Sequence, residues 1–247
     1  MGLCEIEMLS TIKRFLKAVP GLRSAVLYLR HRAWLRRRPE RLLRKIFEGA
    51  ADLQIVQIGS NDGFTQDPVH DLLLKHPSWR ALFVEPVPFL FAKLRANYGD
   101  ESRFEFEEAA IAREAGTLPF YYVSSEAAEK ISDLPVWHDQ LGSFNPAHIT
   151  NHLGEMIAPY IVKTDIRTET LPAVLQRHAV QQIDLLHIDT EGADWLILQQ
   201  LDFSKFQPKV ILVEKKHLDE TSLGEMRAFL CDYKILDLDD DYLCKRK

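Results

Sequence analysis

Residues 183–198 read IDLLHIDTEGADWLIL, and the pattern changes in the middle of this stretch. Residues 183–188 form an apolar run of the length of a buried β-strand, whereas residues 193–198 carry apolar side chains at helical spacing. The acidic turn 189–192 lies between them and holds Asp189 and Glu191. Two interpretations of these carboxylates are open at this point: they cap the helix, or a strand delivers them to a ligand.

The same alternation of strand and helix patterns runs along most of the chain. Apolar, β-branched runs predict strands at 54–58, 80–84, 104–111, 117–123, 183–188 and 210–213. Helical patterns follow most of them, so the chain is expected to form a doubly wound, mostly parallel α/β sheet with right-handed crossovers. The C-terminal runs 233–238 and 242–247 flank an acidic turn and predict an antiparallel hairpin at one edge.

Two segments depart from this alternation of strands and helices. Residues 1–50 predict a basic helical extension ahead of the domain at 51–247, because residues 1–48 hold twelve Lys and Arg against four Glu. We expect this extension to dock on the acidic domain, with weak contact to an anionic membrane surface as the alternative. Residues 124–165 are long for a loop and predict a lid-like insertion, in which Trp137 and Phe144 wall a pocket.

Composition narrows the class of protein. The chain has 247 residues, of which 46% are hydrophobic and 27% charged, as in an ordinary globular protein. Its cysteines, Cys4, Cys231 and Cys244, show neither a disulfide framework nor metal-ligand spacing. No apolar stretch reaches the roughly 18 residues that span a bilayer, and no clean signal-peptide region is present. The expected location is therefore cytoplasmic, with peripheral membrane contact as an option, and no nucleic-acid partner is expected.

Acidic residues follow several of the predicted strands. Because parallel strands end at one edge of the sheet, a glycine turn and several carboxylates are expected to meet there: residues 59–63, Glu85, Glu107, Glu108, Asp189, Glu191 and Glu214. The turn lacks the middle glycine of a dinucleotide fingerprint, and the acidity would repel a pyrophosphate. A carboxylate suits a ribose diol and an acidic pocket suits a cation, so these residues favour S-adenosylmethionine as the ligand.

Five motifs occur in an order that resembles the FkbM family of S-adenosylmethionine-dependent methyltransferases. They are VQIGSNDGF (56–64), FVEPVPFLFAKLRANYG (83–99), EEAAI (107–111), DLLHIDTEGADWLILQQL (184–201) and KVILVEKKHL (209–218). The resemblance covers residues 52–237 and implies a class I methyltransferase (Rossmann-like) fold. It also implies O-methylation of a hydroxyl on a sugar, glycan or natural-product-like small molecule.

The resemblance also implies cofactor contacts at particular positions. The methionine portion would lie on Gly59, Ser60, Asn61, Asp62 and Gly63, the ribose on Glu85 and Pro86, and the adenine beside Glu108 and Ala109. Asp189 would lie next to the transferred methyl group. The chain departs from the usual family pattern at Gln57, where many relatives have Asp, and at His187, where Lys is frequent.

The acceptor side is predicted from chemistry. An alcohol is a weak nucleophile at neutral pH, so a base near the acceptor helps, and Asp189, Glu191 and His217 are the candidates. Ser143, His148 and Glu214 are candidate acceptor contacts. No residue pattern requires a metal, and Mg²⁺ held by the acidic edge through water is the lesser alternative. Two other classes stay open: a nucleotide-dependent oxidoreductase on a similar sheet, and a non-catalytic interaction module. The oligomeric state is not predicted.

Overall fold

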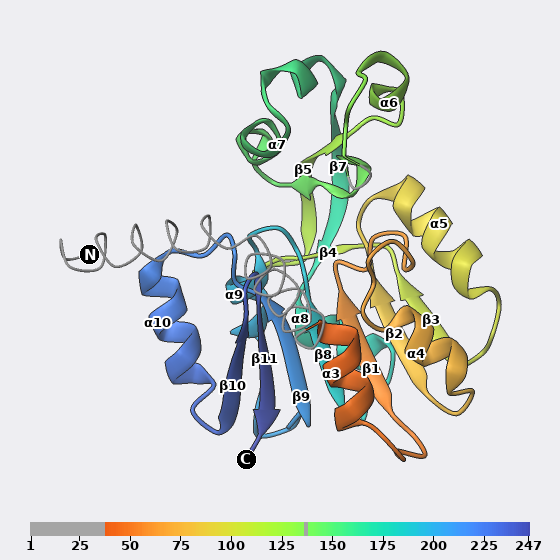
Figure 1. Cartoon of the computed structure of the whole chain (residues 1–247), viewed down its shortest axis with the longest axis vertical. Coiled ribbons are helices and arrows are strands. Elements are labelled where there is room, and N and C mark those ends of the chain that lie inside the picture. The colour runs from red at the N-terminus through yellow and green to blue at the C-terminus, as the bar shows by residue number, and fades with distance from the viewer. Residues whose placement is uncertain (1–37, 136–137) are drawn as a thin grey trace, which may run out of the picture. The chain divides into compact units, whose positions relative to one another are not determined.

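The structure is a computed structural model of the chain, and it describes residues 38–135 and 138–247 (Figure 1). The chain divides into two units, Met1–Ile46 and Phe47–Lys247, and each is considered by itself. The described part of the first unit contains helix α3 (Pro39–Ile46), which begins at the proline expected to open it. Most of the basic extension predicted at 1–50 lies outside the described residues, as does Trp137.

The second unit is built on a seven-stranded sheet of order β10-β11-β9-β8-β1-β2-β3. The strands are β1 (Gln54–Ile58), β2 (Arg80–Val84), β3 (Phe104–Glu107), β8 (Leu185–Ile188), β9 (Val210–Glu214), β10 (Tyr233–Leu238) and β11 (Asp241–Arg246). Strands β3, β2, β1, β8 and β9 pair in parallel, and β11 is antiparallel to both of its neighbours. The predicted hairpin is therefore confirmed, with the difference that β11 inserts between β9 and β10 and is the one reversed strand of this sheet.

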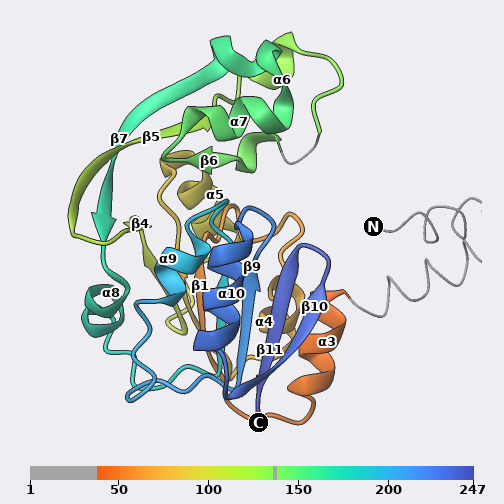
Figure 2. The ribbon, with the colours of Figure 1, turned by 90° about the vertical axis from the view of Figure 1, so that its left-hand side faces the viewer.

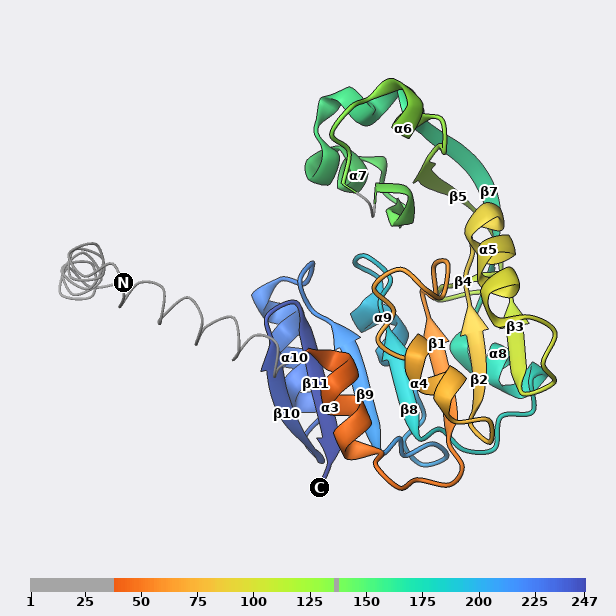
Figure 3. The same cartoon turned by 45° about the vertical axis from the view of Figure 1, so that its right-hand side comes forward.

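Helices cover both faces of the sheet (Figures 2 and 3). Helices α4 (His70–Lys75) and α5 (Pro88–Tyr98) lie on one face, and α8 (Leu171–Arg177), α9 (Asp194–Leu198) and α10 (Glu220–Phe229) lie on the other. Leu186 and Ile188 of β8 join the core beneath the second set, so His187 between them points to the opposite face. Burial lowers the pKa of His187 to about 4, which identifies it as a neutral residue of the core.

A second, four-stranded sheet has the order β4-β7-β5-β6. Its strands are β4 (Ala110–Ile111), β5 (Gly116–Val123), β6 (Gly142–Ser143) and β7 (Ile161–Glu169). The prediction of one strand over 104–111 is therefore wrong, because β3 stays in the large sheet while β4 pairs with β7. Strand β5 pairs with β7 and not with an edge of the large sheet. The first four residues of β5 are exposed, as expected of a ribbon that leaves the core.

The chain between β5 and β7 forms a compact structure, and we call residues 124–160 the lid segment (Figure 2). It contains α6 (Ala127–Lys130), η1 (His138–Gln140), β6, α7 (Pro146–Leu153) and η2 (Glu155–Tyr160). It has its own core, formed by Val123, Ala127, Leu141, Ile149 and Ile157. The insertion predicted at 124–165 is thus a folded element, and its last residues belong to β7. Across the described ranges, no helix is both long and apolar enough to cross a membrane.

Candidate active site

A cavity of about 420 Å³ lies between the carboxyl ends of the central strands and the lid segment. This volume is within the range of small-molecule sites in proteins. One wall is apolar and includes Ile58, Val84, Ala110, Ile111, Leu196 and Ile197. The lid segment contributes Gln140, Ser143, Phe144, Asn145 and His148 to the opposite wall. The cavity therefore offers an apolar surface on the sheet side and polar groups on the lid side.

The turn after β1 requires glycine at its first position. Gly59 has a φ of +78°, and a Cβ atom there would lie 1.7 Å from the backbone oxygen of Asp189. The ends of β1 and β8 can approach this closely only because residue 59 has no side chain. Gly63, at a φ of +65°, packs its Cα against Leu94 and Tyr98 of α5. Gly59 lines the cavity, whereas the position of Gly63 serves the packing of the turn.

Glu85 follows β2 and is 3% exposed. Its Oε2 accepts a hydrogen bond from the backbone N–H of Asn61 at 2.9 Å, and its Oε1 accepts one from Val87 at 2.9 Å. Burial raises the pKa of Glu85 to about 7. Each carboxylate oxygen has two lone pairs, so the side chain can order the turn after β1 and still accept hydrogen bonds from a ligand in the cavity.

The hydrogen bonds in the loop after β8 show whether Asp189 caps the helix that follows. Asp194 accepts hydrogen bonds from the backbone N–H groups of Thr190 at 2.9 Å and Gly192 at 3.0 Å, and so orders the loop. Asp189 lines the cavity, and its carboxylate makes no hydrogen bond to any residue that the structure describes. Burial, and then the nearby Glu214 and Asp194, raise the pKa of Asp189 well above its usual range. Helix α9 has Ala193 at its N-cap and no side-chain cap, so Asp189 does not cap it; Asp194 orders the loop, and Asp189 lines the cavity.

Glu191 is held between two histidines. Its backbone has a φ of +54°, which is unusual for a residue with a side chain. Its Oε2 lies 3.1 Å from Nε2 of His148 and 3.0 Å from Nε2 of His217. Burial opposes ionisation, but the contacts with His148 and then His217 lower the pKa of Glu191 to about 2. Contact with Glu191 and then Glu214 raises the pKa of His217 to about 10.

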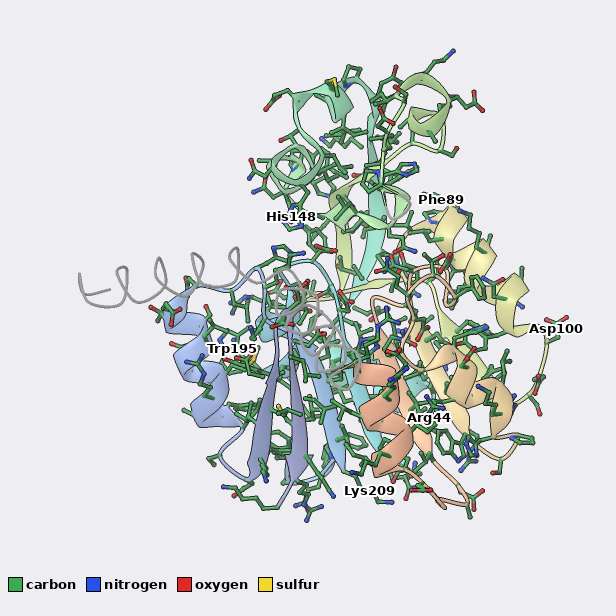
Figure 4. All side chains as sticks on the ribbon, viewed as in Figure 1. Arg44, Phe89, Asp100, His148, Trp195 and Lys209 are labelled. Carbon is green, nitrogen blue, oxygen red and sulfur yellow. The ribbon has the colours of Figure 1, made fainter. Side chains whose placement is uncertain are left out.

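The structure brings most of the predicted site residues to one cavity. Those that line it are Gly59, Asn61, Glu85, Pro86, Ala109, Ser143, His148, Asp189, Glu191 and His217. Figure 4 labels His148 at the lower side of the lid segment, where it faces the large sheet. The cavity wall thus combines residues from the ends of four parallel strands with residues from the insertion.

Five predicted residues do not line the cavity: Ser60, Asp62, Gly63, Glu108 and Glu214. Ser60 Oγ donates to the Gln57 carbonyl at 3.1 Å, and Asp62 Oδ1 accepts from the Thr65 N–H at 2.8 Å, so both groups order the turn itself. Glu214 is buried behind His217, with Oε1 3.4 Å from its Nε2. Among these five, Glu214 alone reaches the cavity-lining groups through another side chain.

The acidic residues at the end of β3 serve a different purpose. Glu107 is buried and accepts from Arg177 Nη1 at 2.8 Å, and it also pairs with Arg167 and His178. The Glu108 carbonyl accepts from Arg167 Nη2 at 3.0 Å, and its side chain is exposed. The sequence grouped both residues with the acidic edge, but arginines from β7 and α8 bind this segment where the chain passes from one sheet to the other.

Sequence reasoning missed three residues near the cavity: Gln140, His152 and Asp194. Gln140 lines the cavity from the lid segment, and His152 lies beside His148 with ring centroids 4.5 Å apart. The spacing of four residues between the two histidines places them on one face of α7, and this spacing was visible in the sequence. Asp194 could have been recognised as the group that orders the loop only from its geometry.

Comparison with protein families gives a match to the methyltransferase FkbM domain over residues 57–235, well over half of the chain. The chain belongs to the FkbM methyltransferase family. The fold is that of class I S-adenosylmethionine-dependent methyltransferases, and S-adenosylmethionine is the cofactor. No curated protein matches this chain.

Solved structures with a similar fold are distant in sequence. Fibrillarin from a fibrillarin–Nop5p complex is 14% identical, with 85% of this chain and 83% of that chain covered at a TM-score of 0.42. Aeropyrum pernix fibrillarin with bound S-adenosyl-L-methionine is 13% identical, with 85% and 76% covered at 0.40. Human methyltransferase-like protein 13 in complex with SAH is 12% identical, with 87% and 78% covered at 0.37.

The residues of the FkbM domain fit this cofactor chemically. The apolar wall suits a flat, uncharged base, and Glu85 offers two oxygens to a pair of ribose hydroxyls. Asp189 also lines the cavity, and a bound sulfonium would favour the ionised form of this carboxyl, whose pKa is raised by burial. The cavity lining contains no Lys or Arg among the described residues, as expected for a ligand without phosphate.

Proposed function

We propose that this FkbM protein transfers a methyl group from S-adenosylmethionine to a hydroxyl of a sugar, glycan or natural-product-like small molecule. The observation that supports the proposal best is the position of Asp189. Asp189 lines the cavity between the sheet and the lid segment, and its carboxylate makes no hydrogen bond to a described residue. A carboxylate held in this way is available to orient an acceptor hydroxyl or to take its proton.

The sheet side of the cavity would bind the cofactor. Gly59 and Asn61 would hold the methionine portion with backbone groups, Glu85 and Pro86 the ribose, and Ala109 the adenine. When bound, S-adenosylmethionine supplies an electrophilic methyl group on a positively charged sulfur. The apolar wall and the lid segment would exclude water from the site, which favours the acceptor hydroxyl over water as the nucleophile.

The lid side would bind the acceptor. Ser143 and His148 line the cavity there, and Phe144 packs edge-on against Phe120 with centroids 5.1 Å apart. A hydroxyl, an imidazole and aromatic rings in one cavity wall suit a polar, hydroxylated molecule. Glu191 and His217 contact each other and His148, so Asp189 is the better placed base. Glu214 would act on the acceptor only through His217.

The test is transfer of labelled methyl from S-adenosylmethionine to a panel of hydroxylated small molecules and glycans, with Asp189→Asn as the variant. Asparagine keeps the size of the side chain and removes its charge. Turnover is expected to fall by ~10²-fold or more while the protein stays folded. Asp100→Asn is the matched control, because this carboxylate is 99% exposed and distant from the cavity lining.

Three results would contradict the proposal. An Asp189→Asn variant that transfers methyl groups as fast as the parent would exclude Asp189 from the reaction. Binding of S-adenosylmethionine without transfer to any hydroxylated acceptor would favour the non-catalytic interaction module. Binding of NAD in preference to S-adenosylmethionine would favour the oxidoreductase alternative, which the family assignment opposes.

A further inference from the structure

Four side chains with metal-binding groups meet where the lid segment faces the large sheet. His148 and His152 come from α7, Glu191 from the loop after β8, and His217 from the loop after β9. We call these four residues the histidine cluster. One nitrogen or oxygen atom from each lies within 4.8 Å of the others. The three imidazole rings have centroids 4.5–4.9 Å apart, so they surround one carboxylate from three sides.

The spacing of these atoms is close to that of a tetrahedral metal site. Zinc binds histidine nitrogen and carboxylate oxygen at about 2.0–2.2 Å, which puts neighbouring ligand atoms about 3.3–3.5 Å apart. Oε2 of Glu191 lies 3.1 Å from Nε2 of His148 and 3.0 Å from Nε2 of His217. Two ligand pairs are therefore already at nearly the required distance, and a ring nitrogen of His152 lies within 4.8 Å of the other ligand atoms.

Hydrogen bonding within the cluster prepares nitrogens to bind a metal. Nδ1 of His152 lies 2.9 Å from the backbone oxygen of His148. Because a carbonyl only accepts, Nδ1 carries the hydrogen and Nε2 keeps its lone pair, as in most metal-binding histidines. Nε2 of His217 is buried between Glu191 at 3.0 Å and Glu214 at 3.4 Å, and it makes no hydrogen bond of acceptable geometry to any described residue. That nitrogen lacks the partner that a purely hydrogen-bonded cluster would give it.

The ligand types select the class of ion. Imidazole nitrogens favour zinc and its neighbours in the first transition row, whereas Mg²⁺ and Ca²⁺ prefer oxygen ligands.

We infer that His148, His152, Glu191 and His217 bind one zinc-class divalent ion that fastens the lid segment to the ends of β8 and β9. Four protein ligands fill a tetrahedral site, which is the arrangement of structural zinc sites. Because His148, Glu191 and His217 also line the cavity, the ion would fix one wall of the acceptor side. This site goes beyond the proposed function, since it requires neither cofactor nor acceptor, and it departs from the expectation of no metal.

The experiment uses the untagged full chain after removal of metal with a chelator. Zn²⁺ is titrated calorimetrically, and Co²⁺ is added separately as an optical probe. We expect one Zn²⁺ per chain and the intense visible absorption of four-coordinate Co²⁺. We also expect Zn²⁺ to slow hydrogen exchange in α7 and the loop that contains Glu191. None of these measurements involves methyl transfer, so a failure of the proposed function would leave them unchanged.

Variants of histidine complete the test. His152→Ala removes a ligand that does not line the cavity, and His217→Gln removes a second one while keeping a side chain of similar size. Each is expected to weaken Zn²⁺ binding at least about tenfold and to abolish the Co²⁺ spectrum. The matched control is His138→Ala, a lid-segment histidine whose Nδ1 bonds to the Pro135 carbonyl outside the cluster. Absence of Zn²⁺ binding by the parent, or parental affinity in both folded ligand variants, would overturn the inference.

Discussion

Substitution of Gly59 by alanine tests the close approach of β1 and β8 directly. Two costs combine at this position. The φ of +78° is unfavourable for alanine, which costs about 1–2 kcal/mol. The new Cβ would also lie 1.7 Å from the Asp189 backbone oxygen, about half of a normal contact distance. Since this oxygen belongs to a backbone held in the sheet, the overlap is comparable to overpacking of a core, about 1–3 kcal/mol.

Gly49 provides a control for the backbone term alone. Its φ is +77°, and a Cβ there would meet no described atom within 4 Å. Gly49→Ala is therefore expected to lose about 1–2 kcal/mol, and Gly59→Ala to lose about 2 kcal/mol more. For a domain of this size the difference corresponds to about 4–8 °C in Tm.

Thermal unfolding followed by circular dichroism measures the difference, and calorimetry with S-adenosylmethionine measures its effect on the site. We expect Gly59→Ala to lose cofactor binding as well as stability, because any relief of the overlap moves Asp189. Equal Tm values for the two variants would refute the reasoning, since they would show that β1 and β8 do not approach as closely as described.

Two further predictions concern ionisable groups. Burial raises the pKa of Glu85 from 4.5 to about 7. Without cofactor, protonation of Glu85 therefore stabilises the folded protein. This contribution is complete below pH 4.5 and is lost as the pH rises to 7. Ribose hydroxyls donate to the carboxylate, so calorimetry should show tighter S-adenosylmethionine binding as the pH rises through 7. Glu85→Gln should remove this pH dependence. A binding affinity that does not change with pH in the parent would contradict the role of Glu85 in holding the ribose. Burial raises the pKa of the Cys244 thiol to about 12, whereas Cys231 is exposed. When the native protein is labelled with a thiol reagent, mass spectrometry should therefore find Cys231 modified and Cys244 unmodified until the protein unfolds. Early labelling of Cys244 would show that β11 is not buried as described.

The large sheet could be predicted because its strands are buried on both faces. Continuous apolar runs such as 81–84 and 210–213 have few other structures available in a chain of this composition. The run 104–111 was wrongly predicted as one strand, because its apolar content does not show that the chain passes from the large sheet to the small one between β3 and β4. The change depends on Arg167 and Arg177, which come from sequence about 60 and 70 residues away and bind the segment around Glu107.

The candidate site was predictable to the extent that it depends on strand ends. Glu85 and Asp189 follow directly from sheet topology, and both line the cavity. The sequence could not assign the capping role, because Asp189 and Asp194 are both plausible caps until their hydrogen bonds are known. The lid side was predictable only as an insertion, since the approach of α7 to Glu191 depends on packing between segments far apart in the chain.

The way in which the lid segment joins the domain has a consequence for how such enzymes diversify. It enters through β5 and leaves through β7, whose outermost residues, Gly116 and Thr168, are paired neighbours. The lid segment between these strands could be exchanged for another sequence while Arg167 and the strand ends that would form the cofactor side stay unchanged. Evolution, or a protein engineer, could thus change the molecule being methylated by swapping a single contiguous cassette. The donor half of the active site would be inherited intact.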